Sequence, residues 1–197
     1  MRRDSVVCRT AGVGRQSSFK GAIVRWSDGG VYNGPMNPYG KIFKALNGAG
    51  VRYIVVGGVA MNLLGYPRFT GDIDVLLALD EANLANMGAL MESMGYERRL
   101  PMDLQALGDE KKVIRWMREK ELVAYTFINA REPQFSIDVI VGPSLKFVDY
   151  ERHRTVVTVW DIAIPVVSID DLIGMKRKSP RKKDAEDVAA LLELKGL

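Results

Sequence analysis

Cysteine and histidine are almost absent from this 197-residue chain, which contains one of each, Cys8 and His153. A single cysteine cannot form an internal disulfide, so the sequence is typical of a protein from a reducing compartment. One histidine excludes a histidine-rich zinc site and argues against serine–histidine or cysteine–histidine catalysis. Asp, Glu, Lys and Arg remain as the side chains that could carry chemistry.

Long hydrophobic runs are missing as well. No stretch reaches the roughly 18 uninterrupted apolar residues that a membrane helix needs, and the N-terminus has no apolar segment typical of a secretory signal. The content of 47% hydrophobic and 26% charged residues is ordinary for a globular protein and fits one domain. We therefore expect a soluble, cytoplasmic protein with no membrane contact.

The net charge of +4 is concentrated near the N-terminus. Residues 1–35 hold six basic and two acidic side chains, whereas the rest of the chain is balanced, which is weak support for nucleic-acid binding by the folded part. Residues 1–35 also lack hydrophobic periodicity, so we expect a flexible extension followed by one domain over 36–197. Met36 precedes the first periodic segment, which favours a misassigned translation start over the alternative of a transit peptide.

From residue 37 onward, hydrophobic periodicity predicts alternating helices and strands, then a strand-rich middle and a helical end. This order predicts an α+β fold with a mixed central sheet and C-terminal helices. Asp80 is expected to cap the helix that follows it. The expected helices are a segment around 42–46 ending at Gly48 or Gly50, 59–65, 81–94, an irregular 102–119, 169–177 and 183–195. The expected strands are 52–56, 72–78, an antiparallel pair near 122–128 and 135–141, and a pair at 155–160 and 162–168.

The most informative stretch places two glycines, Gly57 and Gly58, after one strand and two aspartates, Asp72 and Asp74, on the next. Side chains alternate along a strand, so the two carboxylates project from the same face and repel each other. Mg²⁺ resolves this conflict, because it prefers carboxylate ligands and shares them with substrate phosphates. Glycines before a helix let a phosphate approach the backbone. The stretch therefore predicts phosphoryl or nucleotidyl transfer.

A third carboxylate, Asp138, lies in the middle of an otherwise apolar strand. A buried acid is costly unless it is paired or bound to a metal. If its strand lies beside strand 72–78, three carboxylates converge, and Asp138 could help to activate an attacking hydroxyl. The alternative is a strand residue that faces solvent.

Gly57-Gly58 followed by Leu64-Gly65-x-Pro67-Arg68-x-Thr70-x-Asp72-Ile73-Asp74 resembles motif I of the DNA polymerase β-like nucleotidyltransferase superfamily. The similarity is greatest to its AbiEii/AbiGii-like group of type IV toxins. The resemblance implies the polymerase-β-like fold, a glycine turn that holds the triphosphate, Mg²⁺ on the two aspartates, and Asp138 as the third carboxylate. Many superfamily members have Gly-Ser where this chain has Gly-Gly, so a serine contact to phosphate is missing.

The C-terminal part is similar to the closing helices of the same group, through Asp171-Leu172-Ile173-x-x-Lys176 and Arg181-x-Lys183-Asp184-x-x-Asp187-Val188. The resemblance implies that Lys176 contacts the triphosphate, and Arg68 could touch phosphate as well. Thr70 is included in the expected nucleotide site, although it could be a loop hydroxyl only. Asp184 and Asp187 either start the last helix favourably or belong to the active site.

The resulting hypothesis is a Mg²⁺-dependent nucleotidyltransferase that moves an NMP from an NTP to an acceptor hydroxyl on an RNA end, a protein or a small molecule. A toxin–antitoxin role with a cognate antitoxin follows from the resemblance. The alternative is a catalytically silent nucleotide-binding or regulatory protein on the same fold. Trp116, between basic residues, could stack on RNA but is better explained as a partly buried helix residue, and His153 as a surface residue.

Overall fold

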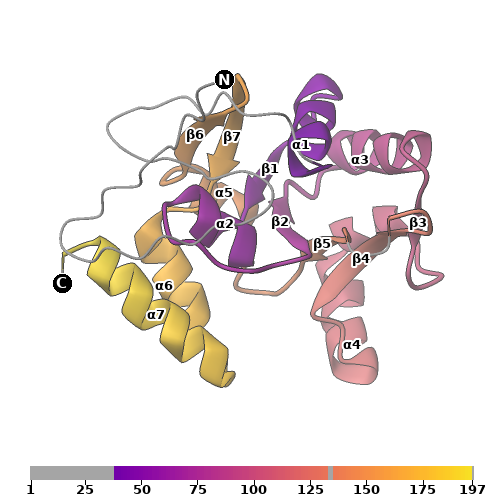
Figure 1. Cartoon of the computed structure of the whole chain (residues 1–197). Coiled ribbons are helices and arrows are strands. Elements are labelled where there is room, and N and C mark those ends of the chain that lie inside the picture. The colour runs from indigo at the N-terminus through magenta and orange to yellow at the C-terminus, as the bar shows by residue number, and fades with distance from the viewer. Residues whose placement is uncertain (1–37, 133–134, 197) are drawn as a thin grey trace, which may run out of the picture.

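The structure is a computed structural model that describes residues 38–132 and 135–196. The expected N-terminal extension over 1–35 lies outside these residues. The described part forms one mixed sheet with helices packed around it (Figure 1). In that part, no helix is both long enough and apolar enough to cross a membrane.

Seven strands form the sheet in the order β3-β4-β5-β2-β1-β7-β6. The two pairs β2–β5 and β1–β7 are parallel, and the other four neighbouring pairs are antiparallel. The mixed sheet that the sequence predicts is therefore confirmed. The strands are β1 (Tyr53–Val55), β2 (Ile73–Leu77), β3 (Tyr96–Arg98), β4 (Ala124–Asn129), β5 (Ile137–Ile140), β6 (Thr155–Val159) and β7 (Ile162–Val166).

Two groups of helices lie on different sides of the sheet, whereas α1 and α5 lie near β7 and β1 (Figure 1). The C-terminal pair α6 and α7 packs together beside α2, whereas α3 and α4 lie at the other end, near β3 and β4. The helices are α1 (Pro38–Gly48), α2 (Gly57–Leu63), α3 (Glu81–Ser93), α4 (Glu110–Lys120), α5 (Phe147–Glu151), α6 (Ile169–Arg177) and α7 (Lys182–Leu194), with a 3₁₀ helix η1 (Leu104–Gly108) before α4.

The centre of the sheet is completely buried on one face. Ile73 and Val75 on β2, and Ile137 and Val139 on β5, have no exposed surface. Because side chains alternate along a strand, these apolar residues fix the direction of the acidic residues between them. Asp74 and Asp138 consequently project from the opposite face.

Most of the predicted elements are confirmed, with shifts of one or two residues at their ends. Asp80 caps α3, because its side chain accepts a hydrogen bond from the Asn83 backbone N–H. The irregular segment at 102–119 separates into η1 and α4. The short elements β3 and α5 were not predicted, since three and five residues are too few to show a period.

Candidate active site

Asp74 and Asp138 lie opposite each other, because β2 and β5 pair in parallel with these two residues in register. The sequence prediction that Asp138 joins the Asp-x-Asp pair depended on the two strands being neighbours, and the sheet confirms that they are. Asp72 directly precedes β2, and its Oδ1 accepts a hydrogen bond of 2.5 Å from the Ser136 Oγ, just before β5. The starts of two adjacent strands thus bring three carboxylates together.

The electrostatics of these carboxylates reflect burial and mutual repulsion. Burial, followed by the nearby Asp138 charge, raises the pKa of Asp74 to about 6, although a hydrogen bond from the Gly58 backbone N–H opposes the change. Burial also raises the pKa of Asp138, opposed by a hydrogen bond from Thr126 and reinforced by Asp72. Placing like charges in a partly buried site costs free energy. A bound cation would offset this cost by neutralising the repulsion between the carboxylates.

The residues present fit a hard divalent cation. Oδ1 of Asp138 is buried and has no hydrogen-bond partner among the described residues. Oxygen donors from three carboxylates are the ligands that Mg²⁺ prefers. Within residues 38–132 and 135–196, no group of three His, Cys, Asp or Glu side chains is arranged so that it could already hold a metal ion.

The two glycines that begin α2, just after β1, fit closely against the carboxylate site. Gly57 has φ +64°, and a Cβ at this position would lie 1.9 Å from Oδ2 of Asp74. A Cβ on Gly58 would lie 2.8 Å from Oγ1 of Thr70. Only glycine fits at either position without a shift of its neighbours. The two glycines therefore permit the close approach of Asp74 and Thr70, in addition to the predicted approach of a phosphate.

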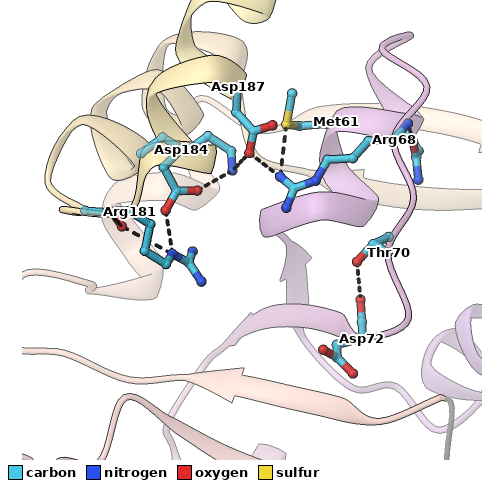
Figure 2. A network of polar contacts seen from close by, with 10 residues as sticks. Met61, Arg68, Thr70, Asp72, Arg181, Asp184 and Asp187 are labelled. Atoms are coloured by element: carbon cyan, nitrogen blue, oxygen red, sulfur yellow. Dashed lines mark hydrogen bonds and ion pairs between the residues drawn. The ribbon is translucent and has the colours of Figure 1, made fainter.

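Lys176 lies in a buried ion-pair network rather than free in solvent. Its Nζ donates to Oδ1 of Asp184 at 3.0 Å and to Oδ2 of Asp187 at 2.6 Å. Burial raises the pKa of Asp74, and the charge of Lys176 offsets a small part of that rise. Arg68, from the loop before β2, donates to the same oxygen of Asp187 (Figure 2).

Asp184 and Asp187 were expected either to start the last helix favourably or to belong to the active site. Both lie in the first two turns of α7, and both are almost completely buried, with 1% and 5% of their surface exposed. Burial tends to raise the pKa of Asp184, but hydrogen bonds from Ser179, Arg181 and Lys176 hold it well below its usual range. The network joins these aspartates to two of the expected phosphate-contacting side chains.

The sequence analysis assigned no role to Ser136, and it quoted Arg181 within the C-terminal motif without giving it one. Ser136 lies two residues before Asp138. This position predicts a contact with Asp72 only once β5 is known to pair with β2. Arg181 donates from Nε to Oδ2 of Asp184 at 2.6 Å, as the close-up shows (Figure 2).

Other expectations concern residues away from the carboxylates. Trp116 is partly buried against the core, as expected, and His153 is exposed. Three basic residues around the α6–α7 connection, Arg177, Lys178 and Lys182, are exposed.

Comparison with solved structures shows the fold. The lincomycin-bound lincosamide antibiotic adenylyltransferase LnuA is 15% identical to this chain, with 78% of this chain and 94% of that chain covered and a TM-score of 0.50. The antibiotic-resistance factor ANT(2'')-Ia is 14% identical, with 77% and 78% covered and a TM-score of 0.50. No curated protein matches the chain.

These neighbours and the seven-stranded sheet identify the polymerase-β-like nucleotidyltransferase fold, which the motif around Asp72 and Asp74 also indicates. A family model described as the nucleotidyl transferase AbiEii toxin of type IV toxin–antitoxin systems matches residues 44–197. Because this match covers most of the chain and includes all of the carboxylates described above, the protein belongs to the AbiEii family and is a nucleotidyltransferase.

Proposed function

We propose that this nucleotidyltransferase moves an NMP from an NTP to the hydroxyl of an acceptor in a Mg²⁺-dependent reaction. The observation that carries the proposal is the register of β2 and β5, which sets Asp138 opposite Asp74 with Asp72 close by. In the reaction, the acceptor oxygen forms a bond to the α-phosphorus, and the bond from that phosphorus to the β-phosphate oxygen breaks. Pyrophosphate is the leaving group.

Asp138 is the proposed acceptor of the hydroxyl proton. Its buried Oδ1 has no hydrogen-bond partner among the described residues, and burial raises its pKa, which makes it a better base than an exposed carboxylate. The hydrogen bond from Ser136 orients Asp72.

Asp72, Asp74 and Asp138 are the residues proposed to hold Mg²⁺. The bound ion would neutralise charge on the phosphates and on the departing pyrophosphate. The raised pKa of Asp74 supports this assignment, because an unneutralised carboxylate here is disfavoured by burial and by Asp138.

The proposed triphosphate site is formed by Gly57, Gly58 and Thr70 on one side and by the cations Arg68 and Lys176 on the other. Thr70 lies so close to Gly58, and Asp74 so close to Gly57, that neither glycine has room for a Cβ. Arg68 and Lys176 meet at Asp187 and bring positive charge beside this turn. Phosphate binding by such donors is mainly electrostatic.

We also propose that the enzyme acts in the cytoplasm as the toxin of a toxin–antitoxin pair with a cognate antitoxin. The description of the matching family supports this context, and the scarcity of cysteine agrees with a reducing compartment. The acceptor hydroxyl is carried by an RNA end, a protein or a small molecule, and these are the separate arms of the test.

The test incubates the purified protein with Mg²⁺ and each of four α-³²P-labelled NTPs. Separate reactions contain total RNA, lysate protein, or small polyhydroxylated compounds such as aminoglycosides. The inactive control is the double variant Asp72→Asn/Asp74→Asn, which keeps side-chain size and removes two charges. The matched control is Asp170→Asn, because Asp170 is exposed on α6 and pairs with Lys195.

Label transferred by the wild type and by Asp170→Asn, but not by the double variant, is the expected result, and the labelled species identifies the acceptor. Mg²⁺-dependent NTP binding with no transfer to any acceptor would instead favour the silent nucleotide-binding alternative. Absence of both binding and transfer would overturn the proposal.

A further inference from the structure

One oxygen of Asp187 joins two cations from distant parts of the chain. Oδ2 accepts a hydrogen bond from Nη1 of Arg68 and one of 2.6 Å from Nζ of Lys176. Lys176 and Asp187 lie on the paired helices α6 and α7, whereas Arg68 lies in the loop that leads from α2 to Asp72 and β2. Figure 2 shows Arg68 pointing from that loop toward Asp187.

The three side chains are buried enough for their contacts to matter. Counting the side-chain atoms alone, the exposed fractions are 16% for Arg68, 6% for Lys176 and 7% for Asp187. Exposed ion pairs contribute little, but removing one partner of a buried pair leaves an uncompensated charge. Asp187 is the carboxylate that brings the two cations together: it is the ion-pair partner of Arg68, and Lys176 is held by Asp187 and Asp184 together.

Both cations also keep hydrogen-bonding capacity beyond Asp187. An ammonium group has three N–H donors, and two of those on Lys176 are directed at Asp184 and Asp187. Nε of Arg68 is buried and has no partner among the described residues. Each cation thus retains a donor that an anionic ligand could accept, which a fully satisfied structural ion pair would not.

We propose that Asp187 is a positioning residue, whose shared oxygen sets Arg68 and Lys176 side by side for the β- and γ-phosphates of the bound NTP. This inference rests on the proposed function, since it requires a triphosphate beside the carboxylates. It links α7 to the loop that ends at Asp72, so the two halves of the site are held in one arrangement. Asp187 itself contacts neither the metal nor the phosphates.

Asp187 could instead compete with a phosphate of the NTP for the two cations, and this alternative predicts the opposite change in NTP affinity. If Asp187 merely occupied the place of a phosphate, removing its charge would free both cations and strengthen NTP binding. If Asp187 positions the two cations, removing its charge leaves Arg68 without its ion-pair partner. The side chain of Arg68 then moves into solvent, and NTP binding weakens. A purely structural role would lower thermal stability without changing the relative affinity for nucleotides with different phosphate numbers.

The experiment measures dissociation constants by calorimetry, in Mg²⁺, for the four NTPs and the corresponding NMPs. The proteins are the wild type, Asp187→Asn, Asp187→Glu and the matched control Asp170→Asn. Asparagine keeps the size and one oxygen acceptor but removes the charge, whereas glutamate keeps the charge. The decisive quantity is the ratio of NTP affinity to NMP affinity for the preferred base.

We expect this ratio to fall at least about tenfold in Asp187→Asn, the lower end of the roughly 10- to 100-fold losses that are typical when a residue that orients a metal ligand is removed. The ratio should recover in part in Asp187→Glu and stay unchanged in Asp170→Asn. An unchanged or increased ratio in Asp187→Asn, measured well below its melting temperature, would overturn the inference.

A second variant covers the case in which Asp187→Asn does not fold, as judged by circular dichroism. Arg68→Gln breaks the same contact from the loop side and should lower the same ratio, and no change there would also overturn the inference. Failure of the proposed function is distinguishable, because the wild type itself would then show neither NTP preference nor transfer.

Discussion

Asp74 on β2 and Asp138 on β5 are direct neighbours in a parallel register, and the charge of Asp138 is one of the causes that raise the pKa of Asp74 to about 6. Both lie on the face opposite the buried Ile73 and Val75. The polypeptide thus maintains repelling carboxylates at its centre, which a protein selected for stability alone would avoid. This relationship leads to predictions about stability as well as activity.

The first prediction concerns pH in the absence of metal. Because the pKa of Asp74 is higher in the folded protein than its ordinary value of 3.8, the folded state binds a proton more tightly than the unfolded chain. The associated stability is present below pH 4 and is lost as pH rises through about 6. The loss is on the order of 3 kcal/mol at most.

Asp74→Asn should remove this loss. We expect the metal-free variant to gain stability relative to the wild type between pH 4 and pH 7, although it should have no transferase activity. Urea unfolding in EDTA at several pH values measures the difference between the two proteins. A constant difference across this range would show that Asp74 titrates normally in the folded protein.

The second prediction concerns the close approach at Gly57. Gly57→Ala places a methyl group on the carboxylate of Asp74 and strains a backbone with φ +64°. The matched control is Gly50→Ala, which has the same φ but nothing within 4 Å of the added methyl group. Strain alone should cost about 1–2 kcal/mol in the control, with activity retained.

We expect Gly57→Ala to cost more than this control and to reduce activity at least about 100-fold, because Asp74 must move. Thermal unfolding and initial rates of nucleotidyl transfer measure the two effects. Equal behaviour of the two variants would mean that the site tolerates a displaced Asp74.

The third prediction concerns Ser136. Ser136→Ala removes the hydrogen bond that orients Asp72, so Mg²⁺ affinity should fall about 10-fold or more. The control is Ser93→Ala, which loses an exposed hydrogen bond to a backbone carbonyl at the end of α3. Titration of Mg²⁺ followed by the change in melting temperature gives both affinities. Identical titration curves for both variants would rule out a role for Ser136 in orienting Asp72.

Local sequence determined much of the fold. Alternating apolar residues predicted β2 and β5, and the Asp80 cap predicted the start of α3. These features depend on backbone preference and on burial of one face, which act over a few residues. The Asp-x-Asp spacing likewise predicted that Asp72 and Asp74 share a face, since alternation along a strand requires it.

Contacts between distant segments were decided by the tertiary structure. The sequence could not establish that β5 pairs with β2, and the prediction that Asp138 lies near Asp72 and Asp74 depended on that pairing. The register of the two strands sets Asp138 opposite Asp74. The same applies to Asp187, which meets an arginine 119 residues earlier in the chain.

The sequence by itself determined which residues could carry the chemistry and how they alternate along each strand, because local geometry follows from local residue types. Only the tertiary structure decided which charges meet. Strand order and helix packing minimise exposed apolar surface across the whole chain, and no single segment contains that information. The carboxylate cluster and the cations joined by Asp187 arise from this global packing.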